Sequence, residues 1–166
     1  MESQAVVENL HGIHGLTYLP NYISAAEETD LLDIIDHKPW STELRRRMQY
    51  YGYRYDTRRR TTGAAGHVDT LPGWLLALAE RLRWDGLVAQ IPDQSAINEY
   101  LPGQGIATHV DCVPCFGDTV LSLSLGSPCV MHFTHTVNTA LRIPALLEPR
   151  SLLVMRGAAR VSAARR

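Results

Sequence analysis

Long apolar runs are absent from this chain, and cysteine is scarce. No hydrophobic stretch approaches the roughly 18 residues that a membrane-spanning helix needs. The first ten residues have neither the basic flank nor the apolar core of a signal peptide. We therefore expect a soluble, intracellular protein that does not bind membranes. The cysteines Cys112, Cys115 and Cys129 are an odd number for a disulfide framework, so we expect all three to be reduced.

Lysine is nearly absent, and arginine carries the basic charge. Lys38 is the single lysine among 16 basic residues. The formal net charge of -1 excludes the overall basic field of many nucleic-acid-binding proteins. Arginine is nevertheless concentrated locally, in the runs 45–47 and 58–60. Any electrostatic attraction to phosphates would therefore come from this part of the chain.

Internal repeats and linker-like segments are also lacking. With 166 residues and 45% hydrophobic content, the chain is long enough for one domain with a real core and too short to predict two. We expect a single domain over residues 1–166 that is monomeric. Its last ten residues mix alanine and arginine, and they continue no strand pattern.

The periodicity of apolar residues changes along the chain from helical to alternating. Ser24 and Glu27 form a capping box, which predicts a helix over 25–37, and Pro72 begins a second helical pattern over 72–84. Later segments alternate as strands do, at 95–100, 118–125 and 128–134, with Gly126-Ser127 as a two-residue turn between the second and third, and 151–155 is a short apolar strand. This order predicts an α+β fold, a jelly roll with the N-terminal helices packed on one sheet.

The triplet His109-Val110-Asp111 is the strongest chemical signal. In an extended chain, side chains at positions i and i+2 point to the same side, so His109 and Asp111 could bind one metal ion. With a second histidine they would form the two-histidine, one-carboxylate triad of non-haem Fe(II) oxygenases. That triad leaves three of the six positions of Fe(II) open for other ligands.

Three longer segments around this triplet resemble the AlkB-like Fe(II)/2-oxoglutarate dioxygenases. They are NEYLPGQGIATHVD at 98–111, FGDTVLSLSLGSPCVMHF at 116–133 and EPRSLLVMRGAAR at 148–160. GLTYLPNYIS at 15–24 and QYYGYRYD at 49–56 are similar to the N-terminal part of the same family. The resemblance implies a double-stranded β-helix, a jelly roll, that demethylates its substrate oxidatively with Fe(II) and 2-oxoglutarate.

The resemblance also assigns residues. His109 and Asp111 match two iron ligands, and Asn98 and Tyr100 match the N-x-Y positions that contact 2-oxoglutarate. We expect Asn98 and Tyr100 to lie on one face of the same strand.

The chain departs from the family near its end. The second iron-binding histidine of the family would fall at about Arg165, and the arginines that bind 2-oxoglutarate would follow it. The sequence has neither, so we expect a C-terminally incomplete domain, by truncation, by a frame shift near Val161, or as a natural variant. His132 or His135 could replace the missing ligand, although a surface role is favoured for both. Zinc on His109, Cys112 and Cys115 is a further alternative.

Seven arginines are interleaved with four tyrosines in the segment RRRMQYYGYRYDTRRR, residues 45–60. Arginine can neutralise phosphates and tyrosine can stack on bases, but a solvated strand pair would look the same. In AlkB-like proteins this region resembles the lid over the substrate, which makes Tyr53 and Arg54 candidates for contact. The leading hypothesis is demethylation of an alkylated nucleic acid, with protein as another substrate class. The alternative is an inactive AlkB-like module that binds nucleic acid or protein without a complete metal site.

Overall fold

The computed structural model describes residues 5–53, 69–113, 115–161 and 163–165. Its contacts divide the chain into two compact units. Unit 1 comprises Met1–Ile35 and Ile106–Arg166, and unit 2 comprises Asp36–Gly105. Unit 2 is therefore an insertion, in sequence, between the two parts of unit 1. Within the described ranges, no helix is both long and apolar enough to span a bilayer.

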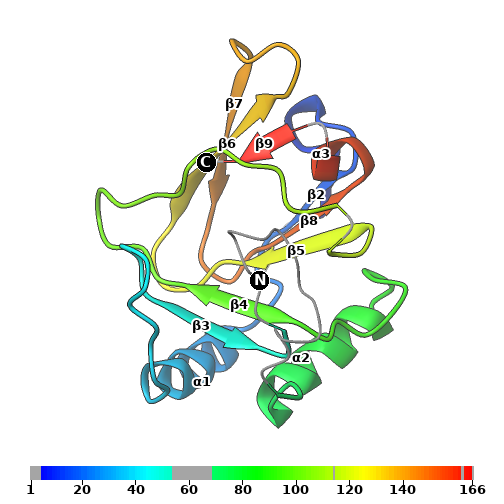
Figure 1. Ribbon diagram of the computed structural model, residues 1–166. Coiled ribbons are helices and arrows are strands. Elements are labelled where there is room, and N and C mark those ends of the chain that lie inside the picture. Colours follow the sequence, from blue (N-terminus) through cyan, green and yellow to red (C-terminus); the bar gives the residue numbers. More distant parts are fainter. Residues whose placement is uncertain (1–4, 54–68, 114, 162, 166) are drawn as a thin grey trace. The chain divides into compact units, whose positions relative to one another are not determined.

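Figure 1 labels most of the helices and strands. The helical elements are η1 (Leu10–Gly12), α1 (Ala25–Asp36), α2 (Gly73–Trp84) and α3 (Gly157–Val161). The strands are β1 (Val7–Glu8), β2 (Leu16–Leu19), β3 (Met48–Tyr51), β4 (Ser95–Asn98), β5 (Thr119–Leu123), β6 (Cys129–His135), β7 (Arg142–Leu147), β8 (Leu152–Arg156) and β9 (Ala163–Arg165).

Unit 1 is built from two antiparallel sheets, with strand orders β1-β2-β8-β5 and β7-β6-β9. β8 lies inside its sheet, and its residues from Leu152 to Met155 are all buried, as expected for a continuous apolar strand covered on both faces. A single core cluster joins the two sheets. It consists of Leu16, Phe133, Ala145, Leu147, Leu153, Met155 and Ala159. Two packed antiparallel sheets agree with the predicted jelly roll and α+β class.

Unit 2 contains the antiparallel pair β3–β4 and helix α2. The Tyr51 ring on β3 meets the Trp74 ring on α2 edge-on, with centroids 5.5 Å apart. Directly after β3, Gly52 has a φ of +77°, and a Cβ there would lie 1.9 Å from the carbonyl oxygen of Asp93. Only glycine fits at this turn.

Both predicted helices are confirmed, because local signals define their starts. At α1, Ser24 Oγ accepts from the Glu27 amide at 3.2 Å, and the Glu27 carboxylate accepts from the Ser24 amide at 2.7 Å. This is the predicted capping box. Pro72 is the N-cap of α2, and Gly86 follows its end with a φ of +71°.

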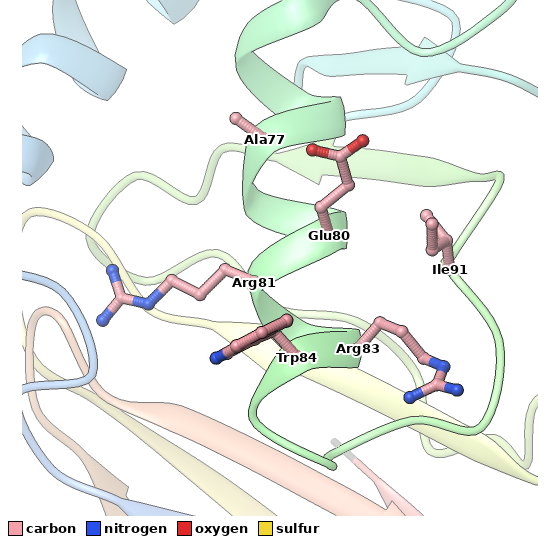
Figure 2. Close-up of a pocket in the computed structure, with 6 residues that line it drawn as sticks. All are labelled: Ala77, Glu80, Arg81, Arg83, Trp84 and Ile91. Atoms are coloured by element: carbon pink, nitrogen blue, oxygen red, sulfur yellow. The ribbon is translucent and has the colours of Figure 1, made fainter.

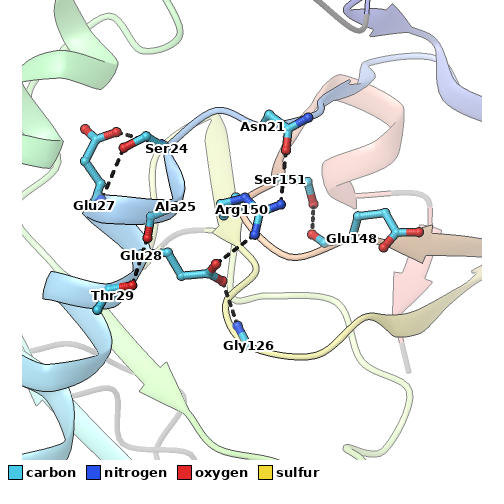
Figure 3. A network of polar contacts seen from close by, with 10 residues as sticks. All are labelled: Asn21, Ser24, Ala25, Glu27, Glu28, Thr29, Gly126, Glu148, Arg150 and Ser151. Atoms are coloured by element: carbon cyan, nitrogen blue, oxygen red, sulfur yellow. Dashed lines mark hydrogen bonds and ion pairs between the residues drawn. The ribbon is translucent and has the colours of Figure 1, made fainter. Parts of the chain in front are cut away.

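Gly126-Ser127 does connect the two predicted strands, but the expectation that they pair as a hairpin is wrong. β5 pairs with β8, whereas β6 pairs with β7 and β9, so this turn connects strands of different sheets. Its position is set by Glu28 of α1, a buried carboxylate that accepts from the Gly126 amide at 2.9 Å and from Arg150 Nη1 at 2.9 Å (Figure 3). A buried carboxylate requires such partners. Long-range polar contacts, rather than the local turn sequence, fix this connection.

Two other expectations need correction. The C-terminal alanine and arginine mixture forms α3 and then β9, whose backbone pairs with β6. The backbone of β9 pairs with β6, and this pairing forms a strand although the side-chain pattern of the segment does not predict one. β4 ends at Asn98, two residues before the predicted boundary, so Tyr100 lies beyond the strand.

Candidate functional site

His109 and Asp111 lie in unit 1, in the loop before β5. The Nε2 atom of His109 is 3.4 Å from Oδ1 of Asp111. The Nδ1 atom of His109 is 2.9 Å from the carbonyl oxygen of Ala107. A carbonyl can only accept, so Nδ1 carries a proton and donates it, and Nε2 is the ring nitrogen that faces the carboxylate.

This arrangement suits a cation. A nitrogen lone pair and a carboxylate oxygen repel each other unless a proton or a metal ion lies between them. A separation of 3.4 Å is compatible with both atoms binding one ion at about 2.1 Å each. Metal-binding histidines commonly donate their other N–H to a carbonyl or carboxylate, as His109 does here. The pair therefore has the geometry of two ligands.

Arg160 holds the main chain that carries Asp111. Its side chain is only 3% exposed. It donates from Nη1 to the carbonyl of Asp111 at 3.0 Å and from Nη2 to the carbonyl of Cys112 at 3.2 Å. The resemblance covered Arg160 but assigned it no role, and nothing in its local sequence indicates this contact, which spans 49 residues.

Cys112 and Cys115 form a disulfide, which corrects the expectation that all three cysteines are reduced. Cys129 remains a free thiol. The backbone explains the pairing: the Cys115 amide donates to the Cys112 carbonyl at 3.1 Å, and this turn brings the two Cα atoms to 5.2 Å. In this state neither sulfur is a thiolate, so His109, Cys112 and Cys115 do not offer the donors that zinc needs.

Neither His132 nor His135 completes a three-ligand group. Throughout the described part of the chain, no three histidine, cysteine or acidic side chains come together around a common point. His135 Nδ1 instead accepts from the amides of Val137 and Asn138, at 3.2 and 3.1 Å. Position 165, where the resemblance places the missing histidine, lies in β9 opposite Phe133 of β6.

Asn98 and Tyr100, the residues expected to contact 2-oxoglutarate, belong to unit 2. Asn98 is the last residue of β4, and its Oδ1 accepts from Nε of Arg46 at 2.8 Å. Tyr100 is 44% exposed.

Next to the contact of Arg46 with Asn98, the neighbouring residues Arg47 and Glu99 also form a contact. Arg47 donates twice to the carboxylate of Glu99, and its guanidinium lies 4.7 Å from the centre of the Trp40 ring. The hydrogen bond from Arg47 lowers the pKa of Glu99, and the same bond raises the pKa of Arg47. This pair is thus charged on both sides at neutral pH.

The residues predicted to contact the substrate are described only in part. Tyr53 is half-buried, and its carbonyl accepts from Gln94 Nε2 at 2.8 Å, which ties the residue to the chain before β4. Arg54 lies outside the described residues, as do the arginines at 58–60.

An open depression lies along α2 and is drawn in Figure 2. It is lined by Ala77, Glu80, Arg81, Arg83, Trp84 and Ile91. None of the candidate site residues lines it. Trp84, which is 90% exposed, shares it with charges of both signs, so the depression has no clear preference for a cation or an anion.

The sequence profile of the 2OG-Fe(II) oxygenase superfamily matches residues 36–162. The chain belongs to this family. Its curated relatives identify it more closely as AlkB-like, as predicted. The alkylated DNA repair protein ALKBH8 homolog of Arabidopsis thaliana is 30% identical over 177 residues, covering 94% of this chain and 51% of the relative.

Other relatives of this chain have names that refer to tRNA or to RNA and DNA. The tRNA (carboxymethyluridine(34)-5-O)-methyltransferase ALKBH8 of Macaca fascicularis is 36% identical over 163 residues, covering 88% of this chain and 23% of the relative. The chain thus spans about half the length of the Arabidopsis relative and about a quarter of the macaque one. The probable RNA/DNA demethylase ALKBH6 of Danio rerio is 32% identical over 124 residues, covering 72% of this chain and 50% of the relative.

A solved structure, that of OsALKBH1, has the same fold. It superposes with a TM-score of 0.73 at 14% identity, covering 98% of this chain and 86% of the other. This confirms the AlkB-like 2OG oxygenase fold predicted from the resemblance. At this identity the likeness concerns the fold alone.

Proposed function

We propose that this chain is an AlkB-type oxygenase domain that uses Fe(II) and 2-oxoglutarate to demethylate an alkylated nucleic acid oxidatively. The observation that carries the proposal is the approach of His109 Nε2 to Asp111 Oδ1 at 3.4 Å, at two positions that the resemblance matches to iron ligands. Asn98 and Tyr100 would bind 2-oxoglutarate, and Tyr53 and Arg54 would contact the substrate. Bound iron and 2-oxoglutarate would supply the oxidising chemistry.

The residues fit iron in part. His109 and Asp111 provide two of the three protein ligands of the family, and no third donor joins them among the described residues. Two protein donors hold a metal ion less tightly than three, so the affinity for Fe(II) should be lower than that of a complete triad. Two other residues position these ligands. The Ala107 carbonyl accepts from His109 Nδ1 and orients the ring, and Arg160 donates to the Asp111 carbonyl and holds that main chain.

Nucleic acid is the substrate class that we favour. The names of the relatives refer to alkylated DNA, to tRNA and to RNA or DNA. The arginine and tyrosine segment at 45–60 has the chemistry for phosphates and bases. Protein remains the other substrate class. The methyltransferase activity in one name belongs to a relative of which this chain covers 23%.

The test is anaerobic loading with Fe(II), followed by 2-oxoglutarate, oxygen and a methylated single-stranded oligonucleotide. We expect succinate and formaldehyde in equal amounts. His109→Ala and Asp111→Ala should abolish both products. His132→Ala is the matched control, because it removes a histidine outside the proposed pair and should leave turnover intact.

A binding module without catalysis is the second candidate function. The observation that favours it is the absence of a third donor around His109 and Asp111 in the described ranges. If the chain retards the oligonucleotide in a gel but forms no succinate with iron, this candidate replaces the first. Succinate that depends on both His109 and Asp111 would eliminate it.

A further inference from the structure

Arg46 forms a contact with the proposed cosubstrate residue that neither the family resemblance nor the sequence pattern assigns. Its Nε donates to Oδ1 of Asn98 at 2.8 Å, across 52 residues of sequence. Both belong to unit 2, where Asn98 pairs with Met48 at the end of the β3–β4 ladder. The amide of Glu99 also donates to the Arg47 carbonyl at 3.0 Å, so the backbone holds the arginine segment against this end of β4.

The chemistry of the contact fixes the orientation of the Asn98 amide. An asparagine side chain can present either an acceptor oxygen or a donor NH₂ group. A guanidinium can only donate, so the amide atom facing Arg46 must be the oxygen. The NH₂ group is left with one long contact, 3.5 Å to the Ala96 carbonyl. Asn98 therefore presents a donor on the side away from Arg46.

The carboxylates and the keto oxygen of 2-oxoglutarate can only accept. An asparagine with its oxygen outward would repel them, whereas one with its NH₂ outward can bind them. We propose that Arg46 is a positioning residue that makes Asn98 a donor toward the carboxylate or keto oxygens of 2-oxoglutarate. This inference rests on the proposed function, because it takes Asn98 as a cosubstrate residue.

Charge supports the same role. Arg47 is neutralised by Glu99, whereas no carboxylate within the described ranges forms an ion pair with Arg46. Arg46 therefore keeps a net positive charge beside Asn98. A positive charge at this place favours a dicarboxylate, and it would do so even where the guanidinium does not touch the ligand.

The first measurement needs no cofactor. In the apo protein, NMR of the side-chain amides should show the Asn98 NH₂ resonances move in Arg46→Gln, because the oxygen of that amide loses its charged donor. Arg45→Gln removes the same charge one residue away, and its side chain has no part in the contact, so the Asn98 resonances should stay in place. Unmoved Asn98 resonances in Arg46→Gln would overturn the contact itself.

The second measurement titrates 2-oxoglutarate into protein containing Mn(II), which does not turn over. Arg46→Gln should weaken binding about tenfold, which corresponds to about 1.4 kcal/mol, and Arg45→Gln by less than twofold. Arg46→Lys keeps a donor and should restore most of the affinity. Asn98→Asp offers only acceptors and should bind more weakly than Arg46→Gln. Should Arg46→Gln itself fail to fold, Arg46→Lys and Asn98→Asp still give opposite expected results.

Two failures can be told apart. If the unmodified protein binds 2-oxoglutarate and Arg46→Gln binds it equally well, the positioning role is overturned and the proposed function stands. If the unmodified protein with Mn(II) does not bind 2-oxoglutarate, the proposed function falls, and the role of Arg46 toward that ligand falls with it.

Discussion

The loop that carries His109 and Asp111 and the β3–β4 end that carries Asn98 are held in different ways. In the loop, a buried arginine donates to main-chain carbonyls, and a disulfide follows directly. At β4, guanidinium groups bind side chains that water reaches, Arg46 to Asn98 and Arg47 to Glu99. Main-chain contacts preserve the path of the loop whatever side chains it carries. The β4 contacts depend on the identity of each partner, so they should be weaker and easier to alter.

The largest effect should come from restoring the missing ligand. Arg165→His places a histidine at about the position where the resemblance puts the family's second histidine ligand, on β9, in the same unit as His109 and Asp111. We expect Fe(II) affinity to rise by more than the 10- to 100-fold that partners outside the ligand set contribute, with succinate formation rising in parallel. Anaerobic Fe(II) titration measures the first and product analysis the second.

Ala164→His is the matched control. It adds the same residue on the same strand, but neighbouring positions of a strand point to opposite faces. Equal gains from both variants would mean that histidine content, and not a third ligand at position 165, improves binding.

Arg160 should be the next most sensitive residue. Arg160→Met keeps apolar volume but leaves the carbonyls of Asp111 and Cys112 without their charged donor in a buried place. We expect the free energy of unfolding to fall by about 2–3 kcal/mol, measured by urea denaturation. Arg156→Met, at an exposed arginine of β8, should cost clearly less. Equal losses would show that the contacts to the ligand loop contribute little.

These contacts also mark the limit of prediction from sequence. α1 and α2 were predictable because Ser24, Glu27 and Pro72 act on backbone groups within a few residues. The pairing of β5 with β8 was not, because it depends on contacts such as that of Glu28 with Gly126, 98 residues apart. A two-residue turn motif at Gly126-Ser127 carries no information about such partners.

The candidate site, like the fold, could be predicted from the sequence only where the contacts are local. The triplet spacing brought His109 near Asp111, because two residues of extended chain suffice for that. The supporting arginines, Arg46 and Arg160, could not be predicted, since each acts across about 50 residues. The odd number of cysteines was a misleading guide, because a pair at three-residue spacing can close locally and leave Cys129 free.

Removing the disulfide should have a moderate effect on the free energy of unfolding. It closes a loop with a sequence separation of 3, and loop-closure entropy gives about 2 kcal/mol for so short a loop. The double variant Cys112→Ser, Cys115→Ser should lose that amount of unfolding free energy. Dithiothreitol should bring the parent protein to the same value and leave the variant unchanged. Cys129→Ser is the control and should match the parent. Alkylation of all three cysteines without reductant would contradict the disulfide.

The smallest effect should come from the exposed pair of Arg47 and Glu99. The hydrogen bond from Arg47 lowers the pKa of Glu99 below its ordinary value of 4.5. A carboxyl group whose pKa is lowered by folding stabilises the protein above that ordinary value, and the contribution is lost as pH falls through the lowered pKa. Arg47 stays protonated throughout this range. The parent protein should therefore exceed Glu99→Gln in stability at pH 7, and the difference should shrink to nothing at acid pH.

Urea denaturation of both proteins between pH 3 and pH 7 gives that difference directly. Because water screens the pair, it should remain smaller than the loss in Arg160→Met. Added salt should reduce it further, whereas salt should leave the Arg160→Met loss nearly unchanged, since buried groups are screened much less. A Glu99→Gln loss that equals the Arg160→Met loss and resists salt would mean that the β4 end is held as firmly as the ligand loop. The difference between the two regions would then lie in their chemistry and not in their strength.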